Sequence, residues 1–311
     1  MVLSAQGKKM KQGLPKKVEI HEVALRDGIQ NEPKIVQIEQ KLRLIRELVA
    51  CGVRRIEVSS FVNPKLVPQM ADTEVLWERI ERKKGILYSA LILSGGGLDR
   101  AIRCRVPHVG IFVSASETHS LKNSNKSIAE ALKEAVRLIG MAQDAGMKVR
   151  AGVMNAFGCA YEGNVPVTRV LKLVRAFMKR GPGEICLADS SGLANPVQME
   201  NVLARVRSET ADADLSLHLH NTRGQGLVNV YAALRQGVSI FDTSMGGLGG
   251  CPFIVGARGN IATEDTIGML HSMGLKTGID LDRFIGTSLR FEKVMEQTFP
   301  AALTHLKKPG C

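Results

Sequence analysis

The chain has 311 residues, of which 44% are hydrophobic and 23% are charged, and this balance excludes intrinsic disorder as the main state. Only 4% are aromatic, which disfavours stacking surfaces for single-stranded nucleic acid. The formal net charge of +12 is compatible with a polyanionic ligand, but no nucleic-acid-binding motif is present. No apolar run approaches the roughly 18 residues of a membrane span. From these observations we expect neither nucleic acid nor a membrane as partner.

Residues 1–17 are rich in lysine and contain no apolar segment typical of a secretory signal, so we predict a disordered basic tail and a cytoplasmic location. Six cysteines occur, none in a CxxC motif, which argues against a disulfide framework or a structural zinc site.

Short apolar runs alternate with helical patterns over residues 18–276. The predicted strands are Val18–Val23, Arg54–Val58, Leu87–Ile92, His108–Val113, Lys148–Met154, Glu184–Ala188, Leu215–His220 and Val238–Thr243. Eight strands, each followed by a helix, predict an α/β protein with a (β/α)8 TIM barrel. The alternative, a doubly wound sheet, requires a glycine-rich phosphate loop after the first strand, and the segment LRDG at residues 25–28 is not one.

Residues 277–311 are predicted to form a short C-terminal helical extension and tail. Two helical stretches are expected there, Leu281–Ile285 and Leu289–Gln297, which together are too short for a domain.

Polar residues gather where the predicted strands end, which is where barrel enzymes carry their chemistry. His218 and His220 lie two apart on one strand, so both side chains face the same side. They are either satisfied interior histidines or two ligands of a divalent cation. Asp27 and Asn260 follow neighbouring strands and can complete a mixed nitrogen and oxygen site, which suits Mg²⁺ or Mn²⁺ and also allows Zn²⁺ or Co²⁺.

A glycine-rich loop, SMGGLGGCPF at residues 244–253, follows the last predicted strand. Such a loop is typical of a mobile lid or of a simple flexible turn. If it closes over a ligand, Cys251 can exchange a proton with it.

Several of these segments resemble one known family, the 3-hydroxy-3-methylglutaryl-CoA lyases. The resemblance spans roughly residues 18 to 300 and is carried by LRDGIQNE (25–32), SFVNPK (60–65), GCAYEG (158–163), HLH (218–220), GGCP (249–252) and GN (259–260). It implies a TIM barrel, a divalent cation and an acyl-CoA substrate. The implied reaction is retro-aldol or retro-Claisen cleavage of the C2–C3 bond of a 3-hydroxyacyl-CoA, which gives acetyl-CoA.

The resemblance also implies roles for individual residues. Asp27, His218, His220 and Asn260 would be the metal ligands, and Arg26 would face the thioester carbonyl. Glu57 would support Arg26 and the metal region, and Cys251 would protonate the thioester enolate. The acceptor of the hydroxyl proton, either Asp27 or a histidine, stays open.

The chain departs from the usual pattern of the family at several positions. Asn221-Thr222-Arg223 follows the histidine pair in place of Asp-Thr-Tyr, and Gly152 stands where tyrosine is common. An arginine at 223 can pair with a substrate carboxylate. The acyl group can therefore be hydroxymethylglutaryl, citramalyl or one with a longer branch at C3.

Two other classes of function remain alternatives. One is an acyl-CoA condensing synthase of the isopropylmalate or homocitrate synthase type, which has similar Arg-Asp and His-x-His elements but lacks the GGCP segment. The other is a non-enzymatic polyanion-binding protein, whose binding would weaken steeply with salt. We also expect a homo-oligomer, either a dimer or a tetramer.

Overall fold

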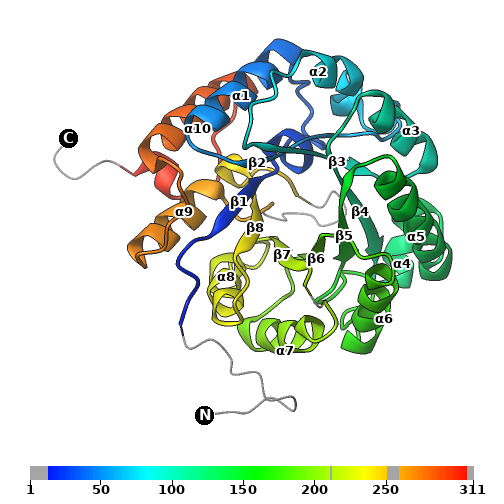
Figure 1. The fold of residues 1–311 in the computed structure, drawn as a ribbon. Helices are drawn as coiled ribbons and strands as arrows, with labels where there is room; N and C mark the ends of the chain where they lie inside the picture. The colour runs from blue at the N-terminus through cyan, green and yellow to red at the C-terminus, as the bar shows by residue number, and fades with distance from the viewer. Residues whose placement is uncertain (1–12, 211, 251–258, 307–311) are drawn as a thin grey trace.

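A computed structural model describes residues 13–210, 212–250 and 259–306 of the chain. Eight parallel strands form a closed barrel in sequence order, as Figure 1 shows from one end. The strands are β1 (Glu19–Glu22), β2 (Arg55–Ser60), β3 (Leu87–Ile92), β4 (His108–Ser114), β5 (Lys148–Met154), β6 (Glu184–Asp189), β7 (Asp214–Leu219) and β8 (Ile240–Thr243). The predicted TIM barrel is thus confirmed.

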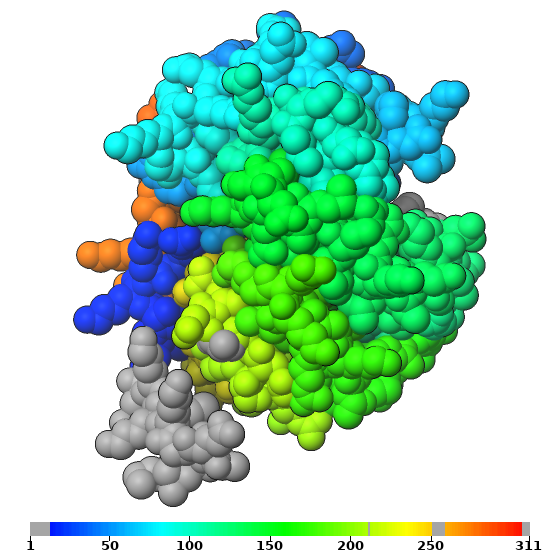
Figure 2. All heavy atoms as spheres, turned by 45° about the vertical axis from the view of Figure 1, so that its right-hand side comes forward, coloured from blue at the N-terminus to red at the C-terminus, as the bar shows by residue number. Residues whose placement is uncertain are grey.

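Helices surround the barrel. They are α1 (Ile38–Ala50), α2 (Thr73–Arg79), α3 (Gly95–Arg103), α4 (Glu117–Ser124), α5 (Ile128–Asp144), α6 (Val167–Met178), α7 (Pro196–Arg207), α8 (Gly226–Arg235), α9 (Thr263–Ser272) and α10 (Leu281–Met295). Figure 2 shows how the side of the molecule with α3, α5 and α6 is covered by their side chains. Within the described residues, none of these helices is both long and apolar enough to cross a membrane.

Local sequence explains individual helices. Ser127 begins α5 with a capping box, since its hydroxyl accepts from the Glu130 amide at 3.2 Å and the Glu130 carboxylate accepts from the Ser127 amide at 2.8 Å. The buried residues of α5 recur at helical spacing and pack against the barrel, among them Ala135, Leu138 and Ile139.

The expected break in the C-terminal helical segment is absent, because α10 is one continuous helix. Phe284, Thr287, Ser288 and Phe291 are buried at helical spacing through the middle of it, so packing favours an unbroken helix. The Asp280 amide, at its start, donates to the Cys51 carbonyl after α1 at 2.9 Å. Figure 1 shows α10 beside α1.

The ends of the first strand also differ from expectation. β1 covers only Glu19–Glu22, and the chain then forms a short π-helical turn, η1 (Ala24–Gly28), which carries Arg26 and Asp27. Lys16 and Lys17, assigned from sequence to the tail, lie against Lys276: Lys17 forms a bridge with it, and the Lys276 amide donates to the Lys16 carbonyl at 3.1 Å.

Candidate metal centre and active site

Three potential metal ligands meet at the C-terminal end of the barrel. Asp27 comes from η1, His218 lies near the end of β7, and His220 directly follows that strand. One ligand atom from each lies within 4.8 Å of the others, and all three residues are buried. The Nε2 atoms of the histidines are 3.1 Å apart, and each is 3.9 Å from Asp27 Oδ2. The structure therefore brings together residues far apart in sequence.

Asn260 joins this group from the segment that begins at Gly259. Its backbone forms a bridge with His220, and its side-chain amide donates to Asp27 Oδ2 at 2.7 Å and to the Leu248 carbonyl at 3.0 Å. Its buried Oδ1 has no hydrogen-bond partner among the described residues, and neither has Nδ1 of His220. A buried acceptor without a partner is costly, so this oxygen points to a ligand that it would bind.

Arg26 connects Asp27 with Glu57 of β2. Its Nε donates to Glu57 Oε2, and its Nη1 donates to Asp27 Oδ1. Burial alone would lower the pKa of Arg26, but the two carboxylates outweigh it and raise that pKa. Conversely, burial alone would raise the pKa of Asp27, but Arg26 and the histidines hold it well below its usual value. Asp27 is thus a carboxylate throughout the physiological range.

The histidines are suited to bind a cation. Burial and the neighbouring His218 lower the pKa of His220 to about 4, so His220 is neutral at pH 7, which is the ligating form. A carboxylate, two imidazoles and an amide oxygen make a donor set that fits a divalent cation. The residues present therefore fit the metal that the sequence predicted.

Asp242 of β8 is a residue of this site that sequence reasoning missed. Its Oδ2 lies 3.0 Å from Nδ1 of His218, so it can fix the imidazole with Nε2 facing the cluster. The available signal was an acidic residue in the middle of a short apolar strand whose neighbours are buried.

Below Asp242 the barrel interior contains further charged side chains. Nη2 of Arg150 on β5 donates to Asp242 Oδ1 at 2.9 Å, and its Nε lies 2.8 Å from Glu184 of β6. Arg55 of β2 pairs with the same Glu184, and His21 of β1 lies 3.3 Å from Asp242. This group, which we call the interior ionic layer, consists of His21, Arg55, Arg150, Glu184 and Asp242. Each member contacts another, and together they fill the barrel beneath the candidate site.

The glycine-rich loop is described only up to Gly250, and Cys251 lies outside the described residues. The root of the loop is tied down by two buried glutamates. Glu22 Oε1 accepts from the Met245 amide at 2.8 Å, and Glu264 accepts from the Gly246 amide at 2.9 Å. At the other side, the Asn31 side chain donates to the Gly250 carbonyl at 3.1 Å.

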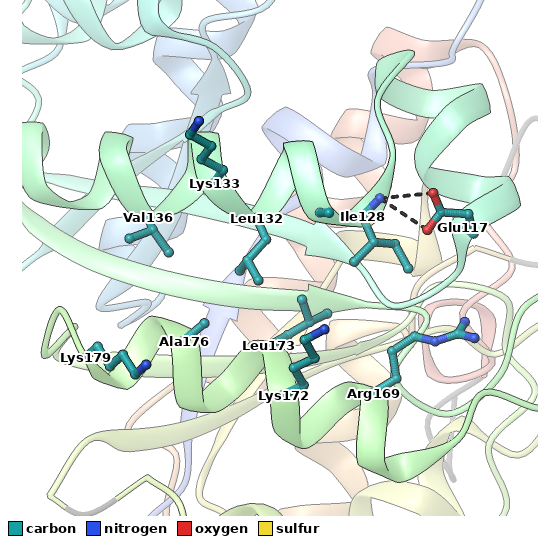
Figure 3. A pocket seen from close by; sticks show the side chains of 11 residues that line it. Glu117, Ile128, Leu132, Lys133, Val136, Arg169, Lys172, Leu173, Ala176 and Lys179 are labelled. Carbon is teal, nitrogen blue, oxygen red and sulfur yellow. Dashed lines mark hydrogen bonds between the residues drawn. The ribbon is translucent and has the colours of Figure 1, made fainter.

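A separate hollow of about 560 Å³ lies on the outside of the barrel between α5 and α6 (Figure 3). Leu132, Val136 and Leu173 form its apolar floor, and Lys133 and Lys172 stand at its rim. It contains none of the residues of the candidate metal centre.

Fold and site together define a (β/α)8 barrel protein with a candidate metal centre at the C-terminal ends of its strands. The family model described as HMGL-like matches residues 17–289, so the chain belongs to this family. The family resemblance found in the motifs is thereby confirmed.

Individual relatives agree with this assignment. A hydroxymethylglutaryl-CoA lyase of Bacillus subtilis is 40% identical over 287 residues, which are 92% of this chain and 96% of the relative. A Pseudomonas aeruginosa enzyme named 3-hydroxy-3-isohexenylglutaryl-CoA/hydroxymethylglutaryl-CoA lyase is 37% identical over 91% of this chain and 94% of its own length. A solved HMG-CoA lyase from Acinetobacter baumannii, in complex with coenzyme A and 3-methylmalate, has a TM-score of 0.90 at 38% identity and covers 95% of this chain and 96% of its own. These relatives are carbon–carbon lyases, and the prediction of a lyase of this kind is confirmed.

Proposed function

We propose that this chain is a metal-dependent lyase that cleaves the C2–C3 bond of a 3-hydroxyacyl-CoA and releases acetyl-CoA. The observation that carries the proposal is the convergence of Asp27, His218 and His220 within 4.8 Å, beside Asn260 and the Arg26–Glu57 pair. A divalent cation bound there, Mg²⁺ or Mn²⁺ by preference, would supply Lewis-acid polarisation of substrate oxygens.

The protein side chains have separate roles in this proposal. Asp27, His218, His220 and Asn260 would hold the cation, and the proton of the C3 hydroxyl would pass to Asp27 or to one of the two histidines. As the C2–C3 bond breaks, its electron pair moves onto the thioester as an enolate, and C3 becomes a ketone. Arg26, positioned by Glu57, stabilises the negative charge on the thioester oxygen.

The enolate must gain a proton at C2 to become acetyl-CoA. We assign this step to the thiol of Cys251, which follows the loop tied down by Glu22 and Glu264. Replacing Cys251 by alanine should leave binding of the cation unchanged and slow turnover strongly. An unchanged rate would show that another group supplies the proton.

The test of the function is a product assay. Hydroxymethylglutaryl-CoA and citramalyl-CoA are offered in parallel, after chelation and again after Mg²⁺ or Mn²⁺ is restored, and the released keto acid is identified beside acetyl-CoA. We expect cleavage that is lost with chelator and recovered with the cation. Full activity of metal-free protein, or no cleavage of either thioester, would contradict the proposal.

We further propose that the chain works as a homo-oligomer, a dimer or a tetramer, in the cytoplasm. Leu66 and Val197 are exposed apolar side chains that a second copy of the chain could cover. Cys51, Cys104, Cys159 and Cys186 are free thiols, in keeping with a reducing compartment. Light scattering coupled to size-exclusion chromatography would test the assembly.

A further inference from the structure

The ring of Phe112, on β4, lies between two glycines on the inside of the barrel. A Cβ atom on Gly152 of β5 would lie only 2.1 Å from Cε1 of the ring and 2.2 Å from its Cδ1. A Cβ atom on Gly110 would lie 3.1 Å from the other edge of the ring. Beneath the ring, the guanidinium carbon of Arg150 is 5.6 Å from the ring centroid. The ring can occupy this position only because residue 152 has no side chain.

Two other apolar side chains share this side of the barrel. Alternation along the strands places Met154 on the same face of β5 as Arg150, and Leu91 on the same face of β3 as Ser89, which contacts His21 in the interior. Leu91, Phe112 and Met154 are partly exposed, and none of them belongs to the hydrophobic core. We call these three residues the apolar wall. Apolar side chains that face inward yet remain accessible are available to a ligand.

The apolar wall lies opposite the polar part of the site. In the closed order of the barrel, β3, β4 and β5 stand across from β7, β8 and β1, which lead to His218, His220, Asn260 and Asp27. The hydroxyl and carboxylate of the proposed substrate require polar partners, and the side of the histidines offers such partners. The remaining substituent of C3 is an alkyl branch, and the side opposite offers apolar contact.

We propose that Phe112, with Leu91 and Met154, receives the alkyl branch at C3, and that Gly152 sets the size of branch accepted by fixing where the Phe112 ring lies. This rests on the proposed function and names the part of the substrate that the wall recognises. The relative from Pseudomonas aeruginosa has both a methyl and an isohexenyl substrate in its name, so branch length is a property that can vary among these proteins.

The test compares kcat/KM for 3-hydroxyglutaryl-CoA, its 3-methyl derivative and a derivative with a longer C3 branch. Gly152→Ala should push the Phe112 ring into the space for the branch. The kcat/KM for the branched substrates, divided by that for the unbranched one, should then fall by about 10-fold or more. Gly110→Ala is the graded control, since its clash is mild and the ratio should change little. Phe112→Ala, and Phe112→Leu if the former folds poorly, should raise kcat/KM for the longer branch relative to methyl by about 10-fold or more.

A matched control separates recognition from stability. Ile111 is the neighbour of Phe112 on β4, faces the other way and is buried in the core. Ile111→Ala should lower stability without changing any substrate ratio. If Phe112→Ala and Gly152→Ala also leave the ratios unchanged, the proposed wall is wrong.

Binding provides a readout that does not depend on turnover. 3-Methylglutaryl-CoA and glutaryl-CoA lack the C3 hydroxyl and cannot be cleaved, so calorimetry measures what the methyl group contributes. We expect tighter binding of the methyl compound to the wild type and a smaller difference in Phe112→Ala. Equal differences in both proteins would overturn the inference. Absence of cleavage of every thioester by the wild type would instead contradict the proposed function.

Discussion

Two groups of buried histidines, arginines and carboxylates lie one above the other inside this barrel, and they differ in charge balance. The interior ionic layer sets Arg55 and Arg150 against Glu184 and Asp242, so its formal charges cancel. At the C-terminal ends of the strands, which we call the mouth, Asp27 and Glu57 both pair with Arg26, so among the described residues two carboxylates share one arginine. Buried charges are stable only when they are compensated, so this arrangement favours the binding of the proposed cation.

The two groups also differ in the kind of side-chain atom that is left without a hydrogen bond. In the ionic layer, His21 contacts Ser89, Arg150 and Asp242. At the mouth, Nδ1 of His220 and Oδ1 of Asn260 have no partner among the described residues. In the ionic layer, Nε of Arg55 and Nε of Arg150 also lack a hydrogen bond among the described residues, but these atoms are donors. The mouth differs because its unpaired atoms include an amide oxygen, which can bind a cation.

The largest expected effect comes from His218→Ala, which removes one proposed ligand of the cation from the mouth. We expect cation binding to be lost and turnover to fall further than the roughly 10²–10³-fold caused by removing one charge-stabilising donor. Calorimetric titration with Mn²⁺ and the cleavage assay measure this. His108→Asn, which removes a buried imidazole near the start of β4, is the control and should retain cation binding.

Arg26→Lys tests the contacts of Arg26 with the two carboxylates at the mouth. Lysine keeps the charge but cannot reproduce the paired contacts to Glu57 and Asp27. We expect kcat to fall by about 10²–10³-fold with little change in cation affinity. A variant as active as the wild type would exclude a role for Arg26 in stabilising the thioester oxygen.

Asp242→Asn tests a residue of the interior ionic layer that also contacts His218 at the mouth. Loss of the carboxylate on Nδ1 of His218 should weaken cation affinity by about 10–100-fold. Glu184→Gln is the matched variant, since it changes a carboxylate of the ionic layer that does not contact His218. It should lower the free energy of unfolding and leave cation affinity unchanged. Equal losses of affinity in both variants would argue against a specific action through His218.

The smallest expected effect on activity comes from Glu22→Gln, which changes the pH dependence of stability. Burial raises the pKa of Glu22 from its ordinary value of 4.5 to about 8, so the folded chain binds this proton more tightly than the unfolded chain. The stability that this proton contributes to the folded chain is fully present below pH 4.5 and is lost as the pH rises through about 8. A pKa difference of one corresponds to about 1.4 kcal/mol.

Glutamine can keep the contacts of the protonated form, because its oxygen accepts from the Ala24 and Met245 amides and its nitrogen lies toward Thr263. Urea unfolding at pH 5 and pH 8.5 should therefore show a smaller loss of stability in Glu22→Gln than in the wild type. Glu78→Gln, at an exposed position, should behave like the wild type. An equal change in the free energy of unfolding between pH 5 and pH 8.5 in all three proteins would refute the assignment to Glu22.

The amino-acid sequence by itself determined the barrel, its strands to within a few residues, and four residues that meet at the mouth, Asp27, His218, His220 and Asn260. Alternating short apolar runs and helical patterns are local, and so are the Arg-Asp and His-x-His pairs, which makes both readable along the chain. The sequence did not predict that α10 is one continuous helix, nor that Arg26 and Asp27 lie in a π-helical turn. Both features depend on packing partners that are far away in sequence.

Only the tertiary structure decided the rest. Asp242 reaches His218, and Arg150 reaches Asp242 and Glu184, only when the barrel closes and brings β5, β6, β7 and β8 together. Likewise, the sequence marks Gly152 only as a departure from the family pattern, and the tertiary structure shows that the Phe112 ring lies against it. Side chains that face a common interior meet across strands, and no local pattern records which of them will touch.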